Sequence, residues 1–271
     1  MINPAIIELL QAHNAAQTET RSSKRQKMLL ASLGKPMLLL SNIYADSIGL
    51  TKTNNSLNKR EKGALNTVNS LLKGGFSAYE LKTLIQSIFS KSVDLDIIDS
   101  EHEEDANLCW DLNYPIPYSW HQRYDLVIDS GTNAHVFNIG TSLLSTAQLP
   151  REGGLLVGAL PFYSPNHGFY NINANCLAEL FCPTNGYQLL ALNIHGYTSP
   201  WHSLQGESLN RFVLTEYLGE SRTYDEFLAK VQATQISPKK LDIFNTLYYA
   251  AQRHTILPIT PPQQRKYKYS T

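Results

Sequence analysis

Residues 124–132 read YDLVIDSGT, an apolar run that ends in acidic and small polar residues. The run 124–128 is the clearest strand signal in the chain. Asp129 ends it, and Gly131 and Thr132 lie in the turn that follows. Ligands of open α/β sheets bind beyond the carboxyl ends of the strands. We therefore expect Asp129, Gly131 and Thr132 to line a ligand-binding edge of a sheet.

The segments on either side of this run alternate between strand and helix patterns. Further strands are expected at residues 36–41 (PMLLLS), 93–98, 107–110, 155–160, 187–194 and 244–251. Helices are expected at residues 4–17, 61–73, 78–89, 136–148 and 174–181. This alternation predicts an α/β fold with a mostly parallel sheet and helices on both faces.

The same patterns suggest how the chain is divided. We expect an N-terminal helical extension at residues 1–35, whose amphipathic helix packs on the main domain. The main domain then spans 36–257, and a polar, proline-rich tail spans 258–271. Residues 195–210 look irregular.

Composition excludes several classes of function. The chain has 23 basic and 23 acidic residues, so it lacks the excess of positive charge that a general nucleic-acid binder needs. Its three cysteines form no CxxC pair, and the spacing of its histidines matches no metal-site pattern. We expect no metal and no nucleic-acid partner. With no signal peptide and no membrane-length apolar run, we expect a cytoplasmic protein that binds no membrane.

Acidic residues also stand near the ends of two other expected strands. Asp96 and Asp99 lie at the end of the second, and Asp111 follows the third. A carboxylate at the first of these positions can accept hydrogen bonds from ribose hydroxyls, and one at the next can accept from an exocyclic amine such as that of adenine. A single such aspartate more often caps a turn, but their recurrence on successive strand ends favours a ligand site.

Four stretches of the chain carry the most distinctive motifs: DLNYPIPYSWHQRYDLVIDSGTNAHVFNI (111–139), NHGFYNINANCLAELFCPTNGY (166–187), TLYYAAQRH (246–254) and PPQQRKY (261–267). They resemble a bacterial group of class I S-adenosylmethionine-dependent methyltransferase-like proteins. That group shares Asp-Leu-Asn, Asp-x-Gly-Thr and His-Gly-Phe-Tyr motifs. The resemblance covers about residues 36–268 and is specific in the middle of the chain.

This resemblance implies a Rossmann-like sheet of seven strands in the order 3-2-1-4-5-7-6, with strand seven antiparallel. It also implies that S-adenosyl-L-methionine lies across the ends of strands one to four. By the same resemblance, Ser41 and Asn42 follow strand one near the methionine moiety, and Asp99 or Asp96 faces the ribose. Asp111 then lies near adenine, and Asp129, Gly131 and Thr132 lie near the amino-acid part of the cofactor or near the substrate.

The expected activity is methyl transfer to a small molecule, with a sugar or natural-product hydroxyl as the acceptor. A hydroxyl nucleophile benefits from a general base, and His135 and His167 are the candidates. Tyr170, in the polar and aromatic segment 161–173, is a candidate substrate contact. For His135 the alternative is a structural histidine that bonds a loop carbonyl.

Two departures from the group favour an alternative function. No glycine follows the expected strand 36–41 until Gly49, although class I methyltransferases have a glycine-rich turn there. The group also has Glu before the histidine of its His-Val-Phe-Asn motif, where this chain has Ala134. The alternative is therefore a catalytically inactive scaffold or partner subunit that keeps the fold. A dinucleotide-dependent enzyme is disfavoured, because no GxGxxG follows any expected strand.

Overall fold

The computed structural model describes residues 4–20, 27–34, 78–101, 106–164, 167–197, 210–213 and 244–263. Its strands are β1 Lys27–Leu33, β2 Ser92–Asp99, β3 Leu108–Cys109, β4 Tyr124–Asp129, β5 Pro150–Tyr163, β6 Tyr187–Tyr197, β7 Asn210–Val213 and β8 Phe244–Arg253. Its helices are α1 Pro4–Thr20, α6 Ala78–Phe89, α7 Ile139–Gln148 and α8 Ala174–Leu180. Short 3-10 turns are η1 Tyr118–Trp120, η2 Thr132–His135 and η3 Pro183–Asn185.

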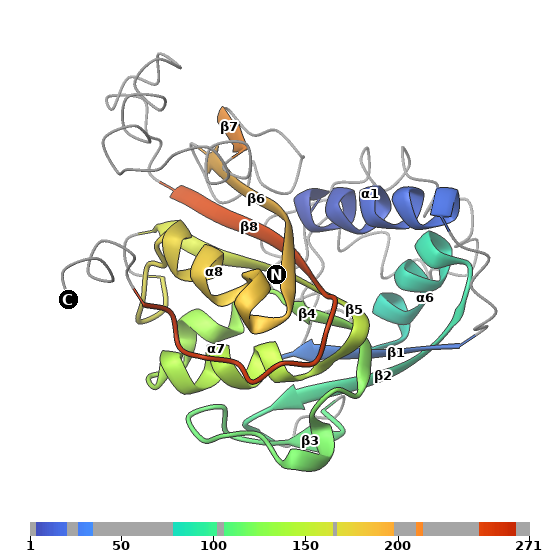
Figure 1. Cartoon of the computed structure of the whole chain (residues 1–271), viewed down its shortest axis with the longest axis horizontal. Coiled ribbons are helices and arrows are strands. Elements are labelled where there is room, and N and C mark those ends of the chain that lie inside the picture. The colour runs from blue at the N-terminus through green and yellow to red at the C-terminus, as the bar shows by residue number, and fades with distance from the viewer. Residues whose placement is uncertain are drawn as a thin grey trace, which may run out of the picture.

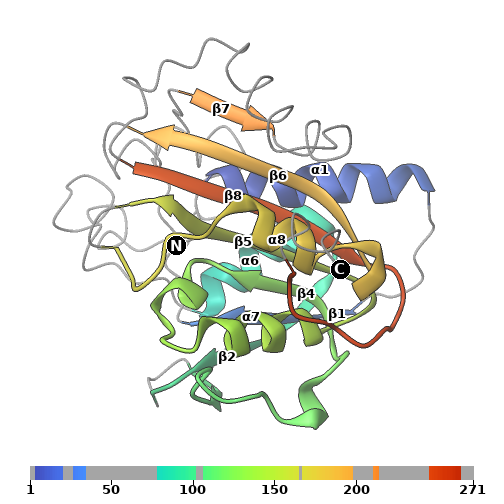
Figure 2. The same ribbon diagram turned by 60° about the vertical axis from the view of Figure 1, so that its left-hand side comes forward.

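The strands form one sheet in the order β3-β2-β1-β4-β5-β8-β6-β7 (Figures 1 and 2). Strands β1 to β5 pair in parallel, and β8 runs antiparallel between β5 and β6. Because β8 is the expected seventh strand, the predicted order 3-2-1-4-5-7-6 is confirmed. The sequence did not predict β7, which adds an eighth, antiparallel strand beside β6.

The position of strand one is a correction. The central strand is β1 at Lys27–Leu33, which pairs with β2 on one side and β4 on the other. The strand was expected at residues 36–41, which lie outside the described residues, as does the expected helix 61–73. The central strand therefore comes from the segment that the sequence suggested was an extension.

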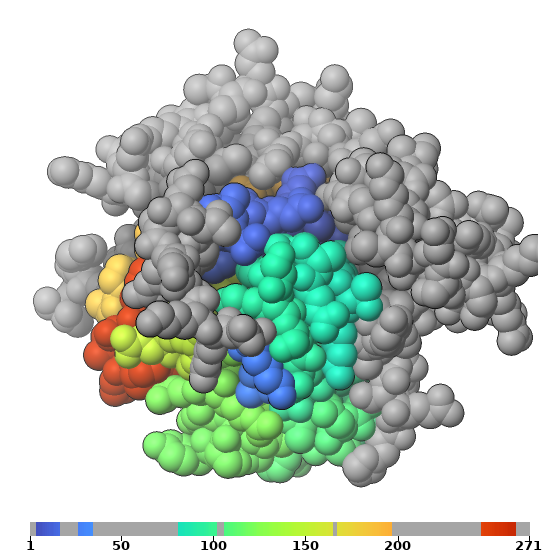
Figure 3. All heavy atoms as spheres, turned by 90° about the vertical axis from the view of Figure 1, so that its right-hand side faces the viewer, coloured from blue at the N-terminus to red at the C-terminus, as the bar shows by residue number. Residues whose placement is uncertain are grey.

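Side chains of the strands alternate between two apolar layers. One layer holds α1 and α6, and Figure 3 shows these helices packed side by side on that face of the sheet. Ile6, Ile7 and Leu10 of α1 are fully buried there, which confirms that the N-terminal helix packs on the main domain. The other layer holds α7 and α8. None of the described helices is long and apolar enough to cross a membrane.

Candidate functional site

The carboxyl ends of three neighbouring strands lie level with one another. Leu33 of β1 pairs with Ile98 of β2 and with Asp129 of β4, and Asp129 pairs with Gly158 of β5. The chain continues outward from β1 to β2 and β3 on one side, and from β4 to β5 on the other. Strand order therefore reverses between β1 and β4, which is where open α/β sheets bind ligands.

A glycine follows the central strand directly. Gly34 has φ of +69°, and its N–H donates to the Ile98 carbonyl over 2.7 Å. A Cβ at this position would lie 2.5 Å from Oγ1 of Thr132, whose hydroxyl donates to the Leu33 carbonyl. The expectation that strand one lacks a following glycine is therefore wrong. Ser41 and Asn42 lie outside the described residues and do not directly follow strand one.

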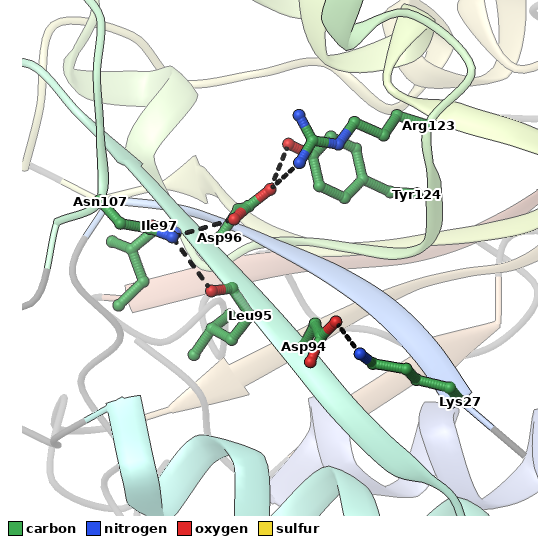
Figure 4. A network of polar contacts seen from close by, with 8 residues as sticks. All are labelled: Lys27, Asp94, Leu95, Asp96, Ile97, Asn107, Arg123 and Tyr124. Carbon is green, nitrogen blue, oxygen red and sulfur yellow. Dashed lines mark hydrogen bonds and ion pairs between the residues drawn. The ribbon is translucent and has the colours of Figure 1, made fainter.

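Asp96 is engaged by protein groups (Figure 4). Its carboxylate accepts hydrogen bonds from Asn107 Nδ2 at 2.9 Å and from the Tyr124 hydroxyl at 3.0 Å, and it pairs with Arg123 at 3.1 Å. Burial, followed by the neighbouring Asp96 charge, raises the pKa of Tyr124. Asp96 also lies within β2, opposite Ala31, rather than at the strand's end. These contacts give Asp96 a structural role, because they join β2 to the start of β4.

Asp99 and Asp111 lie at the carboxyl ends of adjacent strands. Asp99 is the last residue of β2, and its carbonyl accepts from the Trp110 N–H over 2.7 Å, which joins the ends of β2 and β3. The Asp99 side chain is half-buried, and its Oδ1 accepts from the Glu101 N–H at 3.4 Å and from the Ser100 hydroxyl at 3.5 Å. Asp111 is exposed, and its Oδ1 accepts from the backbone and side-chain nitrogens of Asn113 at 2.9 and 2.8 Å. The structure thus brings Asp99 and Asp111 to the same edge of the sheet, whereas Asp96 lies within β2, away from that edge.

Asp129 faces the protein interior. Its side chain is fully buried and accepts hydrogen bonds from the Gly131 and Asn133 N–H groups, from Asn133 Nδ2 at 2.7 Å, and from the Tyr249 hydroxyl at 3.2 Å. Burial raises the pKa of Asp129, although the hydrogen bonds that it accepts act in the opposite direction. Burial, and then the charge of the neighbouring Asp129, raises the pKa of Tyr249. Asp129 therefore organises the turn that carries Gly131 and Thr132 from beneath.

Residues that the sequence analysis missed complete this buried network. Asn133 also bonds Ser142 and Thr146 of α7, so the turn after β4 is anchored to the following helix. Gly158 leaves space for the Tyr249 ring, because a Cβ there would lie 2.4 Å from it. The pattern TLYYAAQRH predicts the strand that carries Tyr249, but no sequence signal shows which residue its hydroxyl reaches.

The two candidate bases lie next to each other. The rings of His135 and His167 have centroids 5.0 Å apart and are inclined at 73°. The segment that carries His167 is held against η2, because Phe169 N–H donates to the Ala134 carbonyl over 2.8 Å. Burial, and then the nearby His135, lowers the pKa of His167, which favours the neutral imidazole that a general base requires.

Two exposed phenylalanines and a half-buried tyrosine lie close in sequence to this histidine pair. Phe137 and Phe169 are 72% and 65% exposed, and their ring centroids lie 6.1 Å apart in an edge-to-face arrangement. Tyr170 donates its hydroxyl to the Phe137 carbonyl over 2.7 Å, and its ring lies 6.5 Å from that of Phe169. The two phenylalanines are a feature of the site that the sequence analysis did not single out.

The described residues near the strand ends form no metal site. Among the described residues, no group of three or more histidine, cysteine or acidic side chains is placed to hold a metal ion. The chemical groups available at this edge are a glycine turn, carboxylates, paired imidazoles and aromatic rings.

Comparisons with known proteins find similarity in the fold. No family model matches the sequence, and no curated protein is significantly similar to it. A chain from the complex of the Haloferax volcanii Trm112 methyltransferase activator is 12% identical over 93% of both chains, with a TM-score of 0.41. Haemonchus contortus phosphoethanolamine N-methyltransferase 2, determined with S-adenosyl-L-methionine, is 10% identical with a TM-score of 0.40. The match covers 90% of this chain and 53% of that one. The cyclase SpnF is 10% identical over 92% of this chain and 82% of its own, with a TM-score of 0.40.

Proposed function

We propose that this protein binds S-adenosyl-L-methionine across the ends of β1 to β4 and transfers its methyl group to a hydroxyl of a small molecule. The observation that carries the proposal is Gly34, which follows the central strand directly at the point where strand order reverses. Glycine at this position removes the side chain that would separate backbone from cofactor. Asp99, at the end of the neighbouring strand, supplies the carboxylate that a ribose needs.

The described residues fit this cofactor in distinct roles. We assign the ribose hydroxyls to Asp99 rather than Asp96, because Asp99 is the last residue of β2, at the strand's carboxyl end, whereas Asp96 lies within the strand. Asp111, beyond the next strand, is assigned to the adenine amine. Thr132 lies across from Gly34, and Gly131 and Thr132 are assigned to the amino-acid part of the cofactor, whereas Asp129 acts through the turn that it holds. Ser41 and Asn42 stay predictions for the methionine moiety.

When bound, the cofactor supplies a methyl group on a positively charged sulfur, which is reactive toward nucleophiles. The protein's part is to orient the acceptor, exclude water and accept a proton. We assign that proton to His135 and His167, which follow β4 and β5 and whose ring centroids lie 5.0 Å apart. General-base assistance contributes about 10²–10⁴-fold in rate.

The test is calorimetric titration with S-adenosylhomocysteine. We expect binding by the native protein and a roughly tenfold or larger loss of affinity in Asp99→Asn, because hydrogen bonds to a charged group contribute about 1.5–3 kcal/mol. Asp94→Asn is the matched control: Asp94 lies on the same strand and pairs with surface Lys27 at 2.6 Å, away from the strand's end (Figure 4). No binding at millimolar ligand, or an equal loss in both variants, would overturn the proposal.

One observation favours the second candidate, a protein that keeps the fold without catalysis. Ala134 is buried and offers only its backbone carbonyl, so the position before His135 brings no carboxylate to the site. A protein that binds S-adenosylhomocysteine but transfers no methyl group from labelled cofactor to any hydroxyl compound would be this scaffold or partner subunit.

A further inference from the structure

The rings of Phe137 and Phe169 are exposed to solvent, and each lies two residues after one of the histidines His135 and His167. Phe137 follows η2, and Phe169 lies in the segment after β5, so the two residues come from different strand ends. Both remain more than half exposed although they contact each other edge to face. Neighbouring exposed aromatic rings are a common feature of binding surfaces. We call these two rings the aromatic platform.

The backbone beneath the aromatic platform is held in place by three contacts. Phe169 N–H donates to the Ala134 carbonyl, and Tyr170 donates its hydroxyl to the Phe137 carbonyl. Gly168 has φ of +69° and packs so closely that a Cβ would lie 2.7 Å from the Ala134 carbonyl oxygen. A ligand that binds here meets a backbone that is already ordered, which lowers the entropic cost of binding.

Polar side chains next to the aromatic platform are engaged within the protein. The Tyr170 hydroxyl is bonded to Phe137, and the Asn138 side chain donates to the Asn113 carbonyl over 3.1 Å. A flat aromatic ring binds to aromatic side chains by offset stacking or edge-to-face contact and needs few hydrogen bonds. The chemistry offered to a ligand is therefore ring faces together with imidazole nitrogens.

We propose that the acceptor is a planar aromatic compound with a hydroxyl on its ring, which stacks on the aromatic platform and directs that hydroxyl toward His135 and His167. The inference rests on the proposed methyl transfer and narrows its substrate class from hydroxyl compounds in general to phenols. A phenolic hydroxyl has a pKa of about 10, as in tyrosine, so its proton passes to a neutral imidazole far more readily than that of a sugar hydroxyl.

The reaction balances without any further reagent. The phenolic proton moves to an imidazole nitrogen, the oxygen's electron pair forms a bond to the methyl carbon, and the carbon–sulfur bond breaks with its electrons staying on sulfur. The products are an aryl methyl ether, S-adenosylhomocysteine and an imidazolium, which returns its proton to water.

The experiment uses 2-naphthol as the probe and methyl glucoside as the sugar comparison. Binding of each to the full chain is measured by saturation-transfer NMR and calorimetry with S-adenosylhomocysteine present. We expect 2-naphthol to bind more tightly than methyl glucoside, and Phe137→Leu and Phe169→Leu each to weaken it about two- to tenfold through loss of ring stacking. Tyr118→Leu is the matched control, because Tyr118 is 84% exposed and lies on η1, outside the platform.

The outcomes separate the two levels of the proposal. If S-adenosylhomocysteine binds but 2-naphthol does not, or if methyl glucoside binds more tightly, the aromatic acceptor is wrong and the transferase proposal stands. If 2-naphthol binding needs both phenylalanines while S-adenosylhomocysteine fails to bind, the platform is a ligand site and the transferase proposal fails. Equal weakening by Tyr118→Leu would also overturn the inference.

Discussion

Gly158 of β5 lies between Asp129 and Tyr249, whose side chains are hydrogen-bonded to each other. It pairs with Asp129 on β4 and with Tyr249 on β8, and the Tyr249 ring occupies the space where a Cβ would be. We predict that Gly158→Ala lowers the free energy of unfolding by about 1–3 kcal/mol, as overpacking does in well-packed cores. Urea denaturation of the variant measures this.

The matched control is Gly140→Ala. Gly140 lies in α7, and a Cβ there meets nothing within 4 Å. Alanine favours helix over glycine by up to about 1 kcal/mol, so this variant should be as stable as the native protein or more stable. If the two variants changed stability equally, the close contact between Gly158 and Tyr249 would not be the cause.

The buried carboxyl of Asp129 should make stability depend on pH. Burial raises its folded-state pKa above the ordinary 3.8, so the folded protein holds this proton more tightly than the unfolded chain does. The stabilising contribution is fully present below the ordinary pKa and is lost as the pH rises through the folded-state pKa. We therefore predict that the unfolding free energy of the native protein, minus that of Asp129→Asn, falls as the pH rises above the ordinary carboxyl pKa of 3.8. Urea denaturation at several pH values measures the difference, and a difference that stays constant or rises would contradict the prediction.

The same residue shows how far sequence reasoning reaches at this scale. The run YDLVID ends in an aspartate, and β4 does end at Asp129. The alternation of side chains cannot show which layer lies over the strand's last residue, because that depends on α7 and on Tyr249, 120 residues away. The choice between Asp96 and Asp99 was open for a similar reason: Arg123 and Asn107 are brought to Asp96 only by the folded sheet.

At the scale of elements, α7 ends against a buried arginine from β8. Nη1 of Arg253 donates to the carbonyls of Ala147, Gln148 and Pro150 at 3.4, 3.3 and 3.1 Å, and the side chain is almost completely buried. The last carbonyls of a helix have no partner within it, and a cation at that end is favoured by the helix dipole. Arg253 therefore joins the end of α7 to the antiparallel strand.

We predict that Arg253→Met lowers the free energy of unfolding by about 1–3 kcal/mol, because it removes the charged donor that hydrogen-bonds three carbonyls at the end of α7. Gln252→Met is the control: this neighbour is less buried and makes a single 3.3 Å bond to the Gly153 carbonyl. It should change stability by no more than about 0.5 kcal/mol. Denaturant titration of both variants decides, and equal effects would exclude the proposed role of the guanidinium.

Most elements were found from sequence because their patterns are local. The helix expected at 78–89 matches α6, and the strand runs at 124–128 and 244–251 match β4 and β8. Strand one was misplaced because KMLLASL and PMLLLS are both short apolar runs after a polar residue, and composition does not rank them. The informative signal was Gly34 directly after the first run, since a glycine turn is what the resemblance requires there.

At the scale of the whole molecule, α1 is part of the same hydrophobic core as β1. Ile6, Ile7 and Leu10 are fully buried in the layer shared by α1, α6 and the sheet. We predict that Leu10→Ala lowers the free energy of unfolding by about 2–5 kcal/mol, the usual cost of truncating a buried leucine. Gln11→Ala, on the exposed side of the same helix, should have almost no effect.

The form of the unfolding curve tests whether residues 1–35 belong to the main domain. If α1 and the sheet share one core, Leu10→Ala should shift the entire transition, with tryptophan fluorescence and circular dichroism changing together. Trp110 and Trp120 pack against the apolar layer on the other face of the sheet from α1, so their fluorescence reports on the main domain. If the fluorescence transition stayed at its native midpoint while helix signal was lost earlier, α1 would be a separable extension and the shared core would be excluded.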